Sequence, residues 1–165
     1  MPFQTLLVSL VLTHLDYGNS VLAGLPVYLV WRLQSVLNAA ARLTNHLRRS
    51  DHIFDALACL HWLRVPERIE FKIAVLTYIV VHGLAPGYLG PLTRVADLPS
   101  RRLLRSVGTN RLVVPTSRLS TVGCRAFPVA GPQTRKDLPE DVTSADPPVW
   151  RTDRRTGKAY TVLWA

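Results

Sequence analysis

Apolar residues recur at helical spacing along the first half of the chain. Between Val27 and Arg48, apolar or small residues follow one another at three- and four-residue steps, while the arginines lie mostly off that stripe. A stripe of this kind marks one face of an amphipathic helix, so the segment is predicted to be helical. The members of the stripe are Leu33, Val36, Leu37, Ala40, Thr44 and Leu47.

The preceding segment, from Phe3 to Leu22, is apolar nearly all round. That pattern predicts a helix that is buried, or one that lacks the surface it would pack against. The apolar run from Thr5 to Thr13 has nine residues, whereas a membrane span needs roughly 20. No basic residue precedes this run, so it also lacks the charged start of a signal peptide. We therefore expect no membrane among the partners, and possible self-association through this apolar helix.

Breakers and capping residues mark the helix boundaries. Gly24 and Pro26 interrupt the pattern, because glycine is permissive and proline cannot continue the hydrogen-bond ladder. Ser50 or Asp51 can cap a short helix that reaches about Leu60, by accepting a hydrogen bond from a free backbone N–H.

A longer helix is predicted to begin near Pro66, which suits a first helical turn. Glu67 complements the positive end of its dipole, and Gly83 is expected to close it. Two apolar stripes on this helix predict packing on both sides. One consists of Ile69, Ile73, Leu76 and Val80, and the other of Phe71, Val75, Tyr78 and His82.

After Pro91 the helical periodicity is lost. Residues 112–114 read as a short strand, and residues 125–130 as another that Pro128 weakens. Beyond Pro139 no periodicity remains, which predicts a poorly ordered tail. The predicted fold is mainly α: a small helical bundle with a short β-hairpin-like element. The predicted segments are a helical domain at 1–93, a basic arm with short strands at 94–140 and a divergent tail at 141–165.

Charge singles out the basic arm. The chain has 20 Lys+Arg against 11 Asp+Glu, a net charge of +9. Residues 94–124 hold six arginines and one acid, so this stretch supplies +5 of that excess, while residues 1–93 and 125–165 supply +2 each. Arginine dominates over lysine, and its planar guanidinium suits phosphate contacts.

The six arginines of the arm are therefore the candidate nucleic-acid-binding residues. Contacts of this kind hold an RNA or DNA backbone without reading sequence. No aromatic residue that could stack on bases lies between Tyr88 and Phe127. A solvated basic loop explains the same pattern, and both interpretations stay open. The candidates are Arg94, Arg101, Arg102, Arg105, Arg111 and Arg118.

No catalytic, cofactor or metal site is predicted. Asp51 and Asp55 stand one helical turn apart, but capping explains the first and solvent exposure the second. Cys59 and His61 lack the spacing of a zinc site, and core packing explains them better. With Cys124 the chain has two cysteines, which favours a reducing intracellular compartment, nucleus or cytoplasm undecided.

Six phrases in order resemble the C-terminal part of reverse transcriptases from jockey-like non-LTR retrotransposons (LINE elements). They cover about residues 5–140. The phrases are LDYGNSVLAGLP, LQSVLNAAARL, DHIFDALACLHWLRVPERIEFKIAVLTY, HGLAPGYL, RSVGTNRLVVPTSRLSTVGCRAF and DLP. The sequence departs from the family at Gly18, where a cysteine is usual, and at Arg135 and Lys136, which replace a Trp-Asn pair.

The resemblance implies a position within a polymerase. This region of such enzymes corresponds to the thumb and post-thumb, so residues 1–93 would be thumb-like and would help to grip template and product. The palm's Tyr/Phe-Ala-Asp-Asp motif has no counterpart here. The expectation is a truncated remnant of an RNA-directed DNA polymerase, not itself an enzyme, with at most residual nucleic-acid binding. The alternative is a helical protein-interaction or structural module with no nucleic-acid role.

Overall fold

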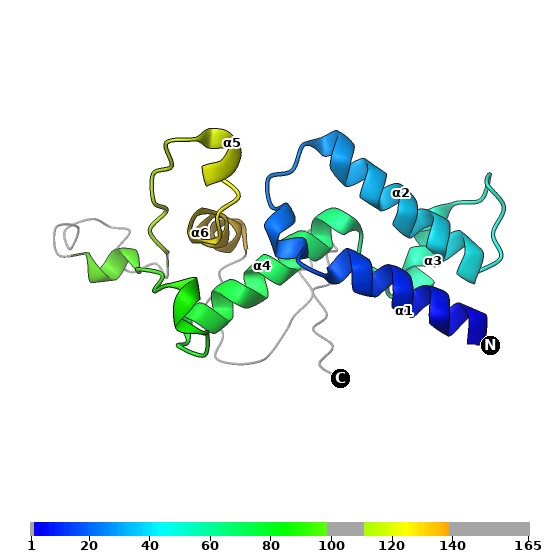
Figure 1. Cartoon of the computed structure of the whole chain (residues 1–165), viewed down its shortest axis with the longest axis horizontal. Helices are drawn as coiled ribbons and strands as arrows, with labels where there is room; N and C mark the ends of the chain where they lie inside the picture. Colours follow the sequence, from blue (N-terminus) through cyan, green and yellow to red (C-terminus); the bar gives the residue numbers. More distant parts are fainter. Residues whose placement is uncertain (1, 99–110, 139–165) are drawn as a thin grey trace. The chain divides into compact units, whose positions relative to one another are not determined.

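The structure is a computed structural model that describes residues 2–98 and 111–138. The described chain is mainly helical (Figure 1), which confirms the predicted fold class. The six α-helices of the described residues are α1 (Pro2–Asp16), α2 (Val27–Thr44), α3 (Ile53–Cys59), α4 (Val65–Val81), α5 (Ser120–Gly123) and α6 (Phe127–Asp137). Short 3-10 turns lie at Asn19–Leu22, Gly87–Leu89 and Val95–Asp97.

The chain divides into two compact units, and the division falls within α4. Unit 1 is residues 1–72 and unit 2 is residues 73–165. The three predicted segments stay predictions, and the third of them, 141–165, lies outside the described residues. Among the helices that the structure describes, none is long and apolar enough to span a bilayer.

Unit 1 is built around α2, which packs against α1 and α3. Leu37 of α2 is fully buried, and four of the other buried residues of unit 1 are alanines. Small side chains let helix backbones approach closely. The other buried apolar residues of unit 1 are Ala23, Ala40, Ala41, Ala56, Leu57, Val65 and Ile69.

Two amide side chains of α2 and its C-cap tie the helices of unit 1 together. Gln34 Oε1 accepts a hydrogen bond from the backbone N–H of Val65 at 2.8 Å, which satisfies a donor left free at the start of α4. Asn45 Nδ2 lies 3.5 Å from the carbonyl oxygen of Ala56. These contacts supply hydrogen-bond partners to backbone groups at helix ends.

Helix α1 is shorter and less buried than its composition predicts. It ends at Asp16, because Gly18 adopts a left-handed conformation with φ 65° and a 3-10 turn follows. Leu6 and Leu10 are exposed, and no residue of α1 from Thr5 to Asp16 is buried. Of the two expectations for this segment, the unpartnered surface therefore describes it better than burial.

The predicted cap of α3 is wrong. The N-cap residue is His52, and it makes no side-chain capping bond. The Asp51 carboxylate instead accepts a hydrogen bond from the backbone N–H of Arg48 at 2.7 Å. A short acidic side chain can bond to a nearby turn, and here that local bond removes it from the helix end.

Both ends of α4 agree with prediction. Pro66 and Glu67 lie in the first turn, and Glu67 accepts a bond from the backbone N–H of Arg64 at 3.3 Å. Gly83 has φ 71°, and the N–H of Leu84 bonds to the carbonyl oxygen of Ile79 at 2.9 Å. This left-handed closure satisfies carbonyls that the helix leaves free.

Helices α2 and α3 end in the same manner, but with histidine in the glycine position. His46 has φ 52° and His61 has φ 53°. The N–H of Leu47 then bonds to Arg42 at 3.0 Å and the N–H of Trp62 to Leu57 at 2.8 Å. Helix α2 therefore stops at Thr44, before the predicted end at Arg48.

Unit 2 packs α6 against the second half of α4. Thr77 of α4 is almost fully buried, and its hydroxyl donates to the carbonyl of Ile73 at 2.7 Å. Gly131 of α6 faces it: a Cβ at this glycine would lie 2.7 Å from Thr77 Oγ1. Pro132 beside it is fully buried. Glycine at this position is what allows the two helices to come so close.

The predicted β-hairpin-like element is wrong. Residues 125–130 run into α6, where Pro128 occupies the first turn, a place that does not need its missing N–H. Leu112 forms only an isolated antiparallel bridge, with Arg94. Its bonds run from Val95 N–H to the Arg111 carbonyl and from Val113 N–H to the Thr93 carbonyl, each at 2.9 Å. The described residues contain no strand.

Candidate nucleic-acid interface

Three of the six predicted arginines can be placed. Arg94, Arg111 and Arg118 are all exposed, and all belong to unit 2. Arg101, Arg102 and Arg105 lie outside the described residues. The bridge between Arg94 and Leu112 brings Arg94 close to Arg111, on the two sides of the undescribed residues 99–110.

Sequence reasoning missed a further arginine in unit 2. Arg135 stands in the last turn of α6 and is half-buried. Its burial, and then the positive charge of Arg94, lower the pKa of the Arg135 guanidinium. Arg94 is therefore near enough to Arg135 for their like charges to act on one another. The signal in the sequence was a basic pair, Arg135 and Lys136, at a helix end that had not been predicted.

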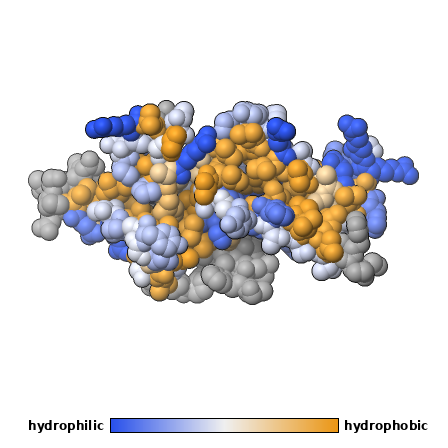
Figure 2. All heavy atoms as spheres, in the orientation of Figure 1, coloured by the Kyte–Doolittle hydropathy of each residue, from blue (hydrophilic) through white to orange (hydrophobic). Residues whose placement is uncertain are grey.

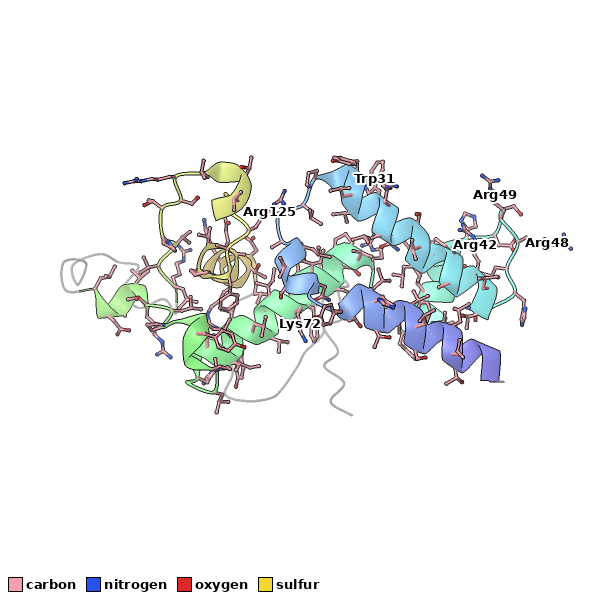
Figure 3. The ribbon with its side chains drawn as sticks, viewed as in Figure 1. Trp31, Arg42, Arg48, Arg49, Lys72 and Arg125 are labelled. Atoms are coloured by element: carbon pink, nitrogen blue, oxygen red, sulfur yellow. The ribbon has the colours of Figure 1, made fainter. Side chains whose placement is uncertain are left out.

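A second basic surface belongs to unit 1. Residues 17–50 contain four arginines and no Asp or Glu, a net charge of +4. Averaged over residues 1–93 this excess falls to +2, which is why the charge count passed over it. Arg48 and Arg49 project from the turn after α2, at the opposite end of the helix from Trp31 (Figure 3). The four are Arg32, Arg42, Arg48 and Arg49.

The outer side of α2 is unusually apolar for an exposed helix face. Trp31 is 71% exposed and Tyr28 is 63% exposed. Apolar residues also cover much of the face formed by α1 and α2, seen in orange in Figure 2. The other exposed apolar side chains there are Leu6, Leu10, Val27, Val36 and Leu43. Aromatic residues able to stack on bases are thus present, but outside the predicted arm.

The cysteines and histidines do not form a metal site. Among the described residues, no group of three or more His, Cys, Asp and Glu side chains could hold a metal ion. A pocket of about 430 Å³ in unit 1 is lined in part by Asp51, Asp55 and Cys59. The prediction that Cys59 and His61 pack in the core is wrong, because both are exposed. His61 owes its position to the left-handed closure of α3.

No protein-family model, curated protein or solved structure matches this chain. The fold and the placed side chains define the class of protein as a mainly α, basic, two-unit chain. The likeness to jockey-like reverse transcriptases stays a prediction.

Proposed function

We propose that this chain is a non-catalytic, helical nucleic-acid-binding segment of the jockey-like reverse transcriptase kind. Its unit 2 arginines would hold the phosphate backbone of RNA or DNA. The observation that supports this most is that Arg94, Arg111 and Arg118 are all exposed in one unit, where the bridge between Arg94 and Leu112 brings Arg94 close to Arg111.

Electrostatics favours a phosphate chain over other ligands for this surface. Arg94, Arg111 and Arg118 take no part in the ion pairs between described residues, which join Arg64 to Glu67 and Arg68 to Asp16. Guanidinium groups bind phosphate oxygens in a bidentate manner, and a chain of phosphates can engage several at once. Such binding gives affinity without sequence preference.

The test is binding of the purified chain to RNA across a salt series. Each phosphate contact to a single strand contributes about 0.7 to the slope of log K against log salt concentration. Replacing Arg111 and Arg118 by glutamine is expected to reduce the slope by about 1.4, if each makes one contact. The matched control is Arg64→Gln, whose guanidinium is paired with Glu67. Binding that does not depend on salt would exclude the proposal.

The non-catalytic part of the proposal has its own test. With primer, template, deoxynucleotides and magnesium, the chain is expected to extend no primer, because two-metal chemistry needs paired carboxylates. Primer-extension activity that copurifies with the chain through successive columns would overturn the non-catalytic part of the proposal.

A second candidate function is self-association through α1. Exposed Leu6 and Leu10 favour it, since apolar surface gains free energy when it leaves water. Sedimentation velocity at rising concentration is expected to show a dimer that Leu6→Ser with Leu10→Ser abolishes. A monomer at all concentrations would remove this candidate.

A further inference from the structure

The outer face of α2 combines aromatic and cationic side chains at helical spacing. Trp31 and Arg32 lie three and four residues after Tyr28, and Ser35 lies four and three residues after them, so all four share one broad face of the helix. All four are exposed. Helix α2 spans 18 residues, or about 27 Å at the usual rise per residue.

The two aromatic rings on this face, those of Tyr28 and Trp31, stack on no other described side chain. The ring contacts of the described residues join Tyr78 to His82 and Arg64 to Phe54, and neither Tyr28 nor Trp31 takes part in one. A single exposed aromatic needs no explanation. Two on adjacent positions of one face, with an arginine beside them, offer flat apolar surface next to positive charge.

Positive charge predominates along this face. Arg32, Arg48 and Arg49 are exposed, and the ion pairs between described residues, Arg64 with Glu67 and Arg68 with Asp16, do not involve them. Arg42 is half-buried, and its Nε has no hydrogen-bond partner within the described part of the chain. Residues 17–50 hold no carboxylate, and the next residue, Asp51, accepts a hydrogen bond from the backbone N–H of Arg48. A ligand that complements the face is therefore anionic and carries flat apolar groups.

We propose that α2 carries a separate site for single-stranded nucleic acid, in which Trp31 and Tyr28 stack on unpaired bases. The phosphates lie along Arg32 and the arginines at the C-terminal end of the helix. This inference rests on the proposed function for the nature of the ligand, but it uses different residues in a different unit. A duplex keeps its base faces covered, so the stacking contribution is specific to a single strand.

Other partners are less well matched to this face. A second copy of the chain would bring a second uncompensated set of arginines against the first. An anionic lipid surface would satisfy the arginines and also the aliphatic side chains Val27, Val36 and Leu43, which bases need not contact. The lipid surface is therefore the rival that the experiment has to separate.

The test uses the full chain and labelled oligo(dT), alone and annealed to oligo(dA), with binding followed by fluorescence anisotropy. Trp31→Ala is expected to weaken oligo(dT) binding about tenfold, the order of one lost base stack. Duplex affinity is expected to stay unchanged, and Trp31→Phe to retain most of the single-strand affinity. Because Trp31 is 71% exposed, the substitution leaves the core intact, which circular dichroism would verify.

Each other outcome is decisive. Equal weakening of single strand and duplex, or no weakening of either, overturns the stacking site. So does a result in which Trp31→Ala abolishes binding to phosphatidylcholine vesicles containing phosphatidylserine but leaves oligo(dT) binding unchanged.

The same measurements separate this inference from the proposed function. If Arg111→Gln with Arg118→Gln changes nothing while Trp31→Ala removes single-strand binding, the unit 2 interface fails and the α2 site stands. If the reverse holds, the unit 2 interface stands and the α2 site fails. Absence of any binding by the unaltered chain removes both.

Discussion

Both units bring helices close together, but they use different small residues to do so. In unit 1 the buried residues of α2 and α3 are Leu37, Leu57 and alanines. In unit 2 the close contact is that of Thr77 of α4 with Gly131 of α6, beside buried Pro132. Alanine favours a helix and permits close approach, whereas glycine and proline permit close approach while opposing the helix. Close contacts between helices therefore need little side-chain volume. Only the alanines of unit 1 also leave a helical pattern in the sequence.

Leu37→Ala should have the largest effect on stability. Leu37 is fully buried, so the substitution leaves a cavity in the core of unit 1. We expect the free energy of unfolding to fall by about 3 kcal/mol, measured by urea denaturation. The matched control is Val36→Ala on the next residue, which is exposed and should change stability by less than about 0.5 kcal/mol. Similar losses for both variants would contradict the burial of Leu37 in the core of unit 1.

Gly131→Ala tests the close approach in unit 2. The new Cβ would meet Thr77 Oγ1 at 2.7 Å, and that hydroxyl is fixed by its bond to Ile73. We expect a net loss of about 1 kcal/mol, in spite of the better helix propensity of alanine.

A double-mutant cycle provides the control for that clash. Thr77→Ala removes the opposing hydroxyl, so Gly131→Ala should cost less in the Thr77→Ala background than in the unaltered chain. Strictly additive effects would show that the two positions do not touch. That result would leave unit 2 without the contact that distinguishes it from unit 1.

The smallest effect concerns the ion pairs of unit 1. Arg68 is mostly buried, donates to the Leu63 carbonyl at 3.1 Å and pairs with Asp16 across a long stretch of sequence. Since Asp16 is about half exposed, we expect Asp16→Asn to cost about 0.5–1 kcal/mol, less at high salt. Thermal melts at two salt concentrations would measure it. Arg64→Ala is the comparison, because Arg64 pairs with Glu67 only three residues away and is more exposed than Arg68; a larger loss there would reverse the ranking.

The helices with periodic patterns could be predicted from the sequence. The stripe containing Leu37 located α2, and Pro66 and Gly83 marked the ends of α4. Helix α6 could not be found in this way, because Pro128 and Pro132 indicate interruption when only local propensity is considered. Burial against Thr77 is a tertiary contact, and it outweighs the propensity of the segment.

The candidate site was less predictable than the fold. The charge count found Arg94, Arg111 and Arg118, which the structure places in one unit. It could not find Arg135, because the influence of Arg94 on its pKa depends on α6, a helix that the sequence pattern does not predict. It also could not find the α2 face, since averaging over 93 residues hid a segment without carboxylates.

The histidines that close α2 and α3 have a consequence for local opening. A side chain with a Cβ in the left-handed region costs roughly 1 kcal/mol that glycine would avoid. The amide hydrogens of Leu47 and Trp62 should therefore exchange with solvent sooner than those around Leu37. The turn between α2 and α3 would then detach while the core stays closed. Arg48 and Arg49 would then lie on a mobile turn, and their guanidinium groups could bind phosphates at different positions.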